Sequence, residues 1–271
     1  LSEQKNRGAS CASSTRGIFA NGLADPGSSR NTIEFITISA TGSAFDFGDI
    51  SGGDHRRWGI TGFSNNTRGL FAGGYTPVRS TAIDFITISS RGNSNFFGEL
   101  SQARRDLTSL ASPTRGVIAG GVDGSNSQNI MDYVTISTSG NAIDFGDLVN
   151  SIIIGGTDYP SRHLAMPASS VTRGLIAGGY YFTDAIDLIT IATTGDSTDF
   201  GNLTQSRAGG NGTSNSIRGV FGGGISPTYR DTIDFVTISS AGNAADFGNL
   251  ASARHYLFNG QCADAHGGLG E

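Results

Sequence analysis

The same position in four successive repeats of this chain holds an arginine. The charged groups of these four arginines are the first candidates for a binding site. These arginines are Arg57, Arg104, Arg162 and Arg207, with Lys5 at the corresponding place in the first repeat. Guanidinium groups gathered at one mouth of a repeat array suit carboxylate, sulfate or phosphate groups on a glycan or a partner peptide. The alternative is scaffolding, in which each arginine pairs with an acid such as Asp49, Glu99 or Asp147 and joins neighbouring repeats. Regular recurrence favours scaffolding.

Aromatic residues form the second candidate set, namely Trp58, Tyr75, Tyr159, Tyr180, Tyr181 and Tyr229. Sugar-binding sites use such rings because the apolar C–H faces of sugars stack on them, while loop Asn, Asp and Ser bond the hydroxyls. Tyrosine is also an ordinary loop anchor, so a structural role fits the same residues. The residues predicted to bind a ligand are Arg57, Trp58, Tyr75, Arg104, Tyr159, Arg162, Tyr180, Arg207 and Tyr229.

No set of residues predicts catalysis, a metal site or a cofactor site. The four histidines have no metal-ligand spacing among themselves, and no Ser/His/Asp set can be selected. The recurring Asp-Phe-Gly segments lack the lysine and catalytic loop of a kinase, and the glycine pairs form no phosphate-binding motif. We therefore expect a protein that is not an enzyme. A hydrolase of the same fold would need an acid/base pair at the channel mouth.

Composition favours short strands joined by tight turns. The chain has 271 residues, of which 41 are glycine and only 15% are charged. A net charge of -5 and a pI near 5.3 argue against binding nucleic acid or an anionic membrane through overall electrostatics. Any contact with a polyanion must therefore be local. No apolar run approaches the length that spans a bilayer, so we expect no membrane insertion.

One phrase is repeated five times, most clearly in residues 114–147. Each copy predicts four strands, and the third is a β-branched run such as Ile-Asp-Phe-Ile-Thr-Ile-Ser. This strand is apolar on both faces because successive side chains alternate. Since no segment shows helical periodicity, neighbouring sheets must cover those faces. Four-stranded sheets packed radially satisfy this requirement, so the predicted fold is all-β, a five-bladed β-propeller with four-stranded antiparallel blades.

We expect a single domain over residues 1–271, with blades at about 1–50, 51–100, 101–148, 149–203 and 204–250. The tail, residues 251–271, begins the phrase a sixth time, and Arg254 stands at the position of the recurring basic residue. We call the recurring basic residues, from Lys5 to Arg254, the basic column. Either the tail closes the ring and displaces the N-terminal segment, or it lies outside and can make a homo-oligomer by pairing with another molecule. Cys11 and Cys262 form a disulfide if these segments lie side by side, and are otherwise two separate buried thiols.

The spacings indicate which loops are free to vary. The basic residue stands eleven residues before the next arginine in all five copies, as from Arg104 to Arg115. The third-strand acid stands fourteen residues before the fourth-strand glycine in all five, as from Asp132 to Gly146. The other two connections vary in length, and in a four-stranded meander they emerge at the same end. Binding residues tend to lie on variable loops held by a rigid scaffold, so this end is the predicted working surface.

The repeat resembles the kelch repeat, through its basic residue, its small-residue strand ending in Gly-Gly, its acidic third strand and its aromatic-ended fourth strand. The pairs Gly73-Gly74, Gly120-Gly121, Gly178-Gly179 and Gly223-Gly224 carry the resemblance best. The chain departs from it at Asn21-Gly22 and in having phenylalanine where kelch repeats have a fourth-strand Trp. It is also similar to repeat arrays in virion and tail-fibre-like proteins of marine tailed phages, particularly cyanophages. That similarity implies a virion or extracellular structural or host-attachment module, with other virion proteins or host surface glycans as partners. The alternative is a free lectin-like carbohydrate-binding protein.

Overall fold

The computed structural model describes residues 1–24, 27–51, 56–124, 126–149, 152–154, 157–159, 161–256 and 262–263. The side chains of 152–154, 157–159 and 262–263 are not among the described atoms. All regular structure in these ranges is β-strand, which confirms the predicted all-β class. Within them, no helix is long and apolar enough to cross a membrane.

Five antiparallel sheets, one per repeat, form the body of the molecule, and we number them 1 to 5 along the chain. The first strands are β2 (Ala9–Ala12), β8 (Thr61–Ser64), β14 (Thr108–Ala111), β22 (Met166–Ser169) and β26 (Asn211–Ser214). The second strands are β3 (Arg16–Ala20), β9 (Arg68–Ala72), β15 (Arg115–Ala119), β23 (Arg173–Ala177) and β27 (Arg218–Gly222). The third strands are β6 (Thr32–Thr37), β12 (Ala82–Thr87), β18 (Ile130–Thr135), β24 (Ala185–Thr190) and β28 (Thr232–Thr237). The fourth strands are β7 (Phe45–Asp49), β13 (Asn95–Glu99), β19 (Ile143–Asp147), β25 (Thr198–Asn202) and β29 (Ala245–Asn249).

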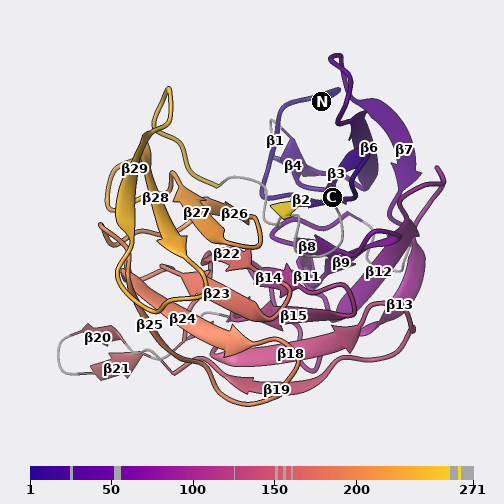
Figure 1. Ribbon diagram of the computed structural model, residues 1–271. Coiled ribbons are helices and arrows are strands. Elements are labelled where there is room, and N and C mark those ends of the chain that lie inside the picture. Colours follow the sequence, from indigo (N-terminus) through magenta and orange to yellow (C-terminus); the bar gives the residue numbers. More distant parts are fainter. Residues whose placement is uncertain are drawn as a thin grey trace.

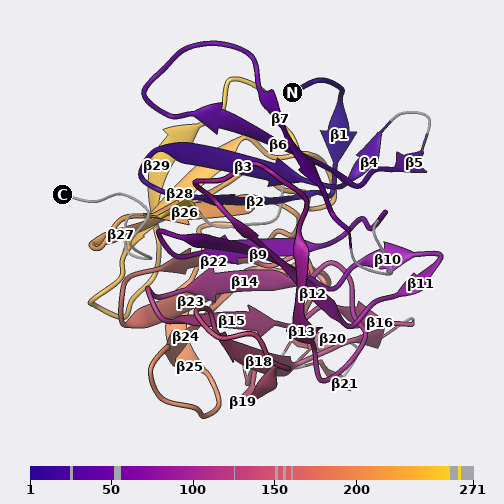
Figure 2. The same ribbon diagram turned by 90° about the vertical axis from the view of Figure 1, so that its right-hand side faces the viewer.

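Short strands lie in the connections at one end of these sheets. They are β1 (Lys5–Asn6), β4 (Leu23–Ala24), β5 (Ser28–Ser29), β10 (Tyr75–Thr76), β11 (Val78–Arg79), β16 (Val122–Asp123), β17 (Asn126–Ser127), β20 (Ile152–Ile154) and β21 (Thr157–Tyr159). The last two form a hairpin in the connection between sheets 3 and 4. Figure 2 shows β4, β5, β10, β11, β16, β20 and β21 at the right-hand side of the molecule. These connections, whose length varies between repeats, therefore lie at a common end, as their spacing predicts.

The sheets follow one another in chain order around their first strands. Each first strand contacts the next, from β2 through β8, β14 and β22 to β26. In Figure 1 the labels of these strands lie near the centre, while the fourth strands lie at the periphery. The arc runs from the indigo first sheet to the yellow fifth sheet, and the ribbons of these two are separated at the top of the view.

The core consists of four apolar clusters, one between each pair of successive sheets. Third strands serve two clusters, because Ile83 of β12 packs toward sheet 3 while Ile86 and Ile88 pack toward sheet 1. This alternation confirms that the third strand is buried on both faces. The clusters between sheets 3 and 4 and between sheets 4 and 5 repeat the arrangement.

Backbone bonds also join successive sheets. The N–H groups of Gly92 and Ser94, in the last turn of sheet 2, donate to Phe47 O and Asp49 O of β7 at 2.8 and 2.9 Å. Gly48 lies beside this contact with φ 144°, and a Cβ there would lie 2.4 Å from Gly92 O. A side chain cannot fit at that position, and the same clash explains the glycine of the fourth strand in repeats 2 to 4, whereas a Cβ at Gly248 of sheet 5 would meet nothing within 4 Å.

The tail takes a place that the sequence alone did not indicate. The backbone of β30 (Cys262–Ala263) pairs in parallel with β26 and also contacts β2. β2 remains paired with β3, so the tail does not displace the N-terminal segment. Cys11 is buried in β2, whereas the Cys262 side chain lies outside the described residues, so the disulfide stays a prediction.

Candidate functional site

The four recurring arginines are enclosed within the sheets. Each has no exposed surface and forms an ion pair with the third-strand acid of its own repeat: Arg57 with Asp84, Arg104 with Asp132, Arg162 with Asp187 and Arg207 with Asp234. In the last pair the Nη1–Oδ2 distance is 2.8 Å, and Lys5 Nζ lies equally far from Glu34 Oε2 in the first repeat. This geometry favours scaffolding over ligand binding for these arginines.

The partners differ from Asp49, Glu99 and Asp147, which the scaffolding interpretation named. The arginine stands just before the first strand, and its side chain extends toward the start of the third strand of the same sheet. Arg104 Nη1 donates to Gly120 O at 2.6 Å and to Ile130 O at 2.9 Å, so it also holds the Gly-Gly turn. Each pair therefore locks the connections of one repeat and does not join two repeats.

Burial shifts the protonation equilibria of these pairs. It lowers the pKa of Arg104, while the Asp132 carboxylate opposes that shift, and it lowers the pKa of Arg162 to about 10. In the first repeat, burial raises the pKa of Glu34, but hydrogen bonds from Lys5 and the Ser2 N–H outweigh it and leave the pKa lowered. Removing one partner of such a buried pair would leave the other charge buried without compensation.

The second arginines of repeats 1 to 4 join successive sheets. Arg16 Nη1 donates to Ile88 O at 2.7 Å, and Arg115 Nη1 donates to Ile191 O at 3.0 Å. The guanidinium carbon of Arg115 also lies 4.2 Å from the ring centroid of Tyr133. These arginines therefore cap backbone carbonyls that follow the third strand of the next sheet.

The two connections of variable length meet each other at the end of each sheet that carries the short strands. The residue after each buried arginine pairs with the residue after the Gly-Gly pair: Trp58 with Tyr75, Arg105 with Val122 and Ala208 with Ile225. Likewise, Tyr180 N–H donates to His163 O at 2.8 Å. We call this end of the molecule the loop face.

A chain of backbone bonds runs across the centre of the loop face. It consists of Arg7, Gly59, Asp106, Leu164 and Gly209, which all have φ between 54° and 68°. The N–H of each donates to the carbonyl of the preceding member, at 2.8, 2.7, 3.0 and 2.8 Å. We call these residues the central turns. Sequence analysis missed them, because they stand two residues after each basic residue but share no side chain, and only the two glycines signal the left-handed conformation.

Cations and aromatic rings gather on the central turns. The guanidinium carbon of Arg7 lies 5.0 Å from the ring centroid of Trp58 and 4.0 Å from that of Tyr256. That of Arg105 lies 4.8 Å from the Trp58 ring, and the rings of Trp58 and Tyr75 are 5.3 Å apart. We call these five residues the aromatic–cationic centre. Of the nine residues predicted to bind a ligand, the structure brings Trp58 and Tyr75 together here.

Asp106 supplies a buried carboxylate within this centre. It is only 2% exposed and bonded to Arg105, and burial raises its pKa while Arg7, Arg105 and Arg79 act in the opposite direction. Among the described atoms, its Oδ1 has no hydrogen-bond partner. One carboxylate among three arginines leaves a local positive charge.

Tyr180 and Tyr229 lie further out, 43% and 55% exposed, and each stacks on a histidine. The ring centroids are 4.5 Å apart for Tyr180 and His163, and 4.1 Å apart for Tyr229 and His255. Burial, together with Arg105 and Arg7, lowers the pKa of His163 to about 4. The remaining tyrosine of the predicted set, Tyr159, has its side chain outside the described part of the chain.

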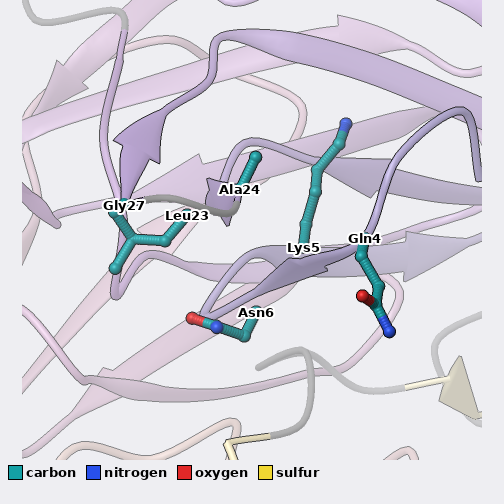
Figure 3. Close-up of a pocket in the computed structure, with 6 residues that line it drawn as sticks. All are labelled: Gln4, Lys5, Asn6, Leu23, Ala24 and Gly27. Carbon is teal, nitrogen blue, oxygen red and sulfur yellow. The ribbon is translucent and has the colours of Figure 1, made fainter.

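A surface cavity of about 390 Å³ lies beside β1 and β4 in the first repeat. Its lining residues are Gln4, Lys5, Asn6, Leu23, Ala24 and Gly27. Figure 3 shows the Lys5 side chain running away from Asn6. The Lys5 amino group is engaged by Thr32 and Glu34, so this cavity presents amides and small apolar groups, with no uncompensated charge from Lys5.

No protein-family model matches the chain, and no curated protein matches it in sequence. Within the ranges that the structure describes, no three His, Cys, Asp or Glu side chains are grouped so that they could hold a metal ion. The chemistry of the loop face is therefore the basis on which a function is proposed.

Proposed function

We propose that the protein is a non-enzymatic virion or extracellular structural and attachment module that acts through its loop face. In this proposal the five sheets are the blades of a kelch-like β-propeller, and the central turns mark its axis. The resemblance of the repeats to kelch and phage tail-fibre-like arrays supports the architecture and the location. Fold alone does not give function, so the loop face carries the rest of the argument.

The observation that carries the proposal is a constant backbone with changing side chains. The central turns repeat the same conformation and the same hydrogen bond from sheet to sheet. The position before each turn holds Asn6, Trp58, Arg105, His163 and Ala208 in successive repeats. A scaffold that keeps its geometry while its outward groups differ is typical of recognition surfaces.

The ligand class follows from the charges at the aromatic–cationic centre. Arg7, Arg79 and Arg105 surround the single carboxylate of Asp106, although the whole chain carries a net charge of -5. Planar guanidinium groups stacked on rings are held ready for carboxylate or sulfate groups. We therefore propose acidic groups on host surface glycans or on other virion proteins as the ligand.

The test uses immobilised alginate and heparin as carboxylate and sulfate probes, with binding measured at fixed salt concentration. We expect Arg105→Gln and Trp58→Ala each to weaken binding by tenfold or more, which corresponds to the loss of a charge-assisted contact. Arg91→Gln is the matched control, because Arg91 lies in the last turn of sheet 2, at the opposite end. Equal binding by all three variants and the parent chain would refute the role of the loop face.

A free lectin-like protein is the second candidate. The exposed Tyr180 stacked on His163 favours it, because an exposed ring can stack on the apolar face of a sugar. A neutral-glycan array separates the two candidates. A lectin binds neutral sugars, loses that binding in Trp58→Ala and Tyr180→Ala, and keeps it in Arg105→Gln. A structural module instead binds no array glycan and copurifies in assemblies.

A further inference from the structure

The face of sheet 5 that points away from sheet 4 carries apolar side chains that no neighbouring sheet covers among the described residues. Phe247 of β29 is 56% exposed, whereas its counterparts Phe47, Phe97, Phe145 and Phe200 are at most 3% exposed. Val220, Ile233 and Leu250 of the same face line a surface cavity of about 240 Å³. The residue types are those that the other four sheets bury against a neighbour.

The opposite face of sheet 1 shows the complementary exposure. Ile38 is 45% exposed, whereas its counterparts Ile88, Ile136, Ile191 and Ile238 are at most 1% exposed. Those four residues all belong to the clusters that join successive sheets. Sheets 5 and 1 therefore each carry one half of the junction that the molecule builds four times, and Figure 1 shows them on either side of a separation.

The inner side of this separation already holds the start of a sixth repeat. Gly224 N–H donates to Arg254 O at 2.8 Å, as Gly179 N–H donates to Arg207 O at 2.9 Å. Tyr256 has φ 49° and stands two residues after Arg254, like the central turns after their basic residues. β30 then lies between β26 and β2, beside the first strands of sheets 5 and 1.

Arg254 itself differs from the rest of the basic column. It is exposed, and its Nη2 donates to Ser252 Oγ at 2.8 Å. Every other member of the column is paired with the third-strand acid of its own repeat. The place occupied by Arg254 therefore calls for a third strand that carries an aspartate or glutamate.

We propose that the opening between sheets 5 and 1 is the seat of a sixth four-stranded sheet, formed by β30 and a three-stranded meander of this same repeat on the same polypeptide. The meander is covalently joined to the chain in this proposal, because linkage makes its docking intramolecular and gives it a high effective concentration. A rigid second copy fits poorly, since every sheet that it could insert keeps at least one neighbouring sheet of its own. The inference concerns a surface distinct from the loop face and does not depend on the ligand.

The occupant is specified by the contacts that sheets 1 to 4 make. The N–H groups of Asp49, Glu99, Asp147 and Asn202 donate to the turn side chain of the following sheet, at 2.9, 3.1, 2.9 and 3.0 Å. Asn249 is the corresponding residue of sheet 5, and the described residues contain no such turn beside it. A meander with Asn or Asp in the turn between its last two strands supplies this acceptor and covers Phe247.

The test joins a copy of residues 67–99 directly ahead of Leu1 in the full chain. Leu1 stands four residues before Lys5, as Leu100 stands before Arg104, so this fusion keeps the repeat spacing. We expect hydrogen exchange of the Asn249 amide to slow by tenfold or more, because it acquires a buried acceptor. A second extension, copied from residues 172–202, tests the same seat with a different loop. Exchange unchanged in both extended chains would overturn the proposal.

Two matched variants show whether the added strands dock as a sixth sheet. Ile86→Asp in the added copy of residues 67–99 places a charge on the face that meets sheet 5, and it should abolish the protection. Arg254→Gln should leave exchange in the original chain unchanged but remove at least part of the protection in the extended chain. Protection that survives Ile86→Asp, or that depends on protein concentration, would contradict docking of the joined meander.

Discussion

Phe145 and Phe247 occupy the same position in two repeats. Because the side chain is the same, substituting each by alanine compares the stability contributed by a buried ring with that of an exposed ring. Phe145 is 2% exposed between sheets 3 and 4, whereas Phe247 is 56% exposed on sheet 5. Phe→Ala in a closed core costs about 3–5 kcal/mol, because the lost transfer energy is increased by the cavity that remains. At Phe247 about half of the ring is already in solvent and no closed cavity forms, so we expect roughly 1 kcal/mol.

The comparison is measured by urea unfolding of Phe145→Ala and Phe247→Ala. Circular dichroism reports the strands, and the fluorescence of Trp58, the single tryptophan, reports sheet 2. Coincident transitions by the two probes are needed before free energies are compared, because stacked repeats can unfold in steps. We expect Phe145→Ala to be less stable than Phe247→Ala by about 2–4 kcal/mol. Equal losses would show that Phe247 is covered in solution and would refute the reasoning.

Three further predictions concern charged groups. Arg104→Met should cost about 3–5 kcal/mol because it leaves the Asp132 carboxylate buried without its partner, and adding Asp132→Leu should recover most of the loss in thermal unfolding; equal instability of the single and double variants would contradict this. His163 has a folded pKa of about 4 against an ordinary 6.5, so its contribution to stability is complete above pH 6.5 and is lost as the pH falls toward 4. We expect up to roughly 2 kcal/mol at pH 4.5, after a discount for partial exposure, and His163→Gln should remove this difference between unfolding at pH 7 and at pH 4.5. Arg68→Gln should lower the free energy of unfolding by about 1–2 kcal/mol, because Arg68 bonds the Ile136 carbonyl of the next sheet at 3.2 Å. Arg218 is the exposed counterpart on sheet 5, so Arg218→Gln should lower the free energy of unfolding by less than about 0.5 kcal/mol in the same measurement.

Much of the fold could be predicted from alternation and spacing. Ile83 and Ile86 point to opposite faces of one strand, and with no helical segments available their burial required a sheet on each side. The constant interval from Asp132 to Gly146 indicated a hairpin of fixed geometry, because the glycine touches the turn of the next sheet. These features depend on local backbone geometry, which the order of residues specifies directly.

The candidate site could be predicted only in part. The pairing of Trp58 with Tyr75 follows from two loops that emerge at the same end. The recurrence of basic residues favoured a structural role, but the ion pairs lie within single repeats and do not join neighbours as that interpretation held. Their partners could not be chosen, since Asp49 and Asp84 are both acids of suitable spacing and only packing decides which one the arginine reaches. Arg7, Arg105 and Asp106 were missed because their shared feature is a backbone angle.

By itself, the order of residues determined the strands, their grouping into five meanders and the end at which variable loops gather, since alternation and turn length act within a few residues. Only the tertiary structure decided that the recurring arginines are buried, that the central turns bond in a row, and that sheets 5 and 1 leave matching faces exposed. These outcomes depend on contacts between residues far apart in the chain, such as Arg7 with Tyr256, and no local pattern encodes them.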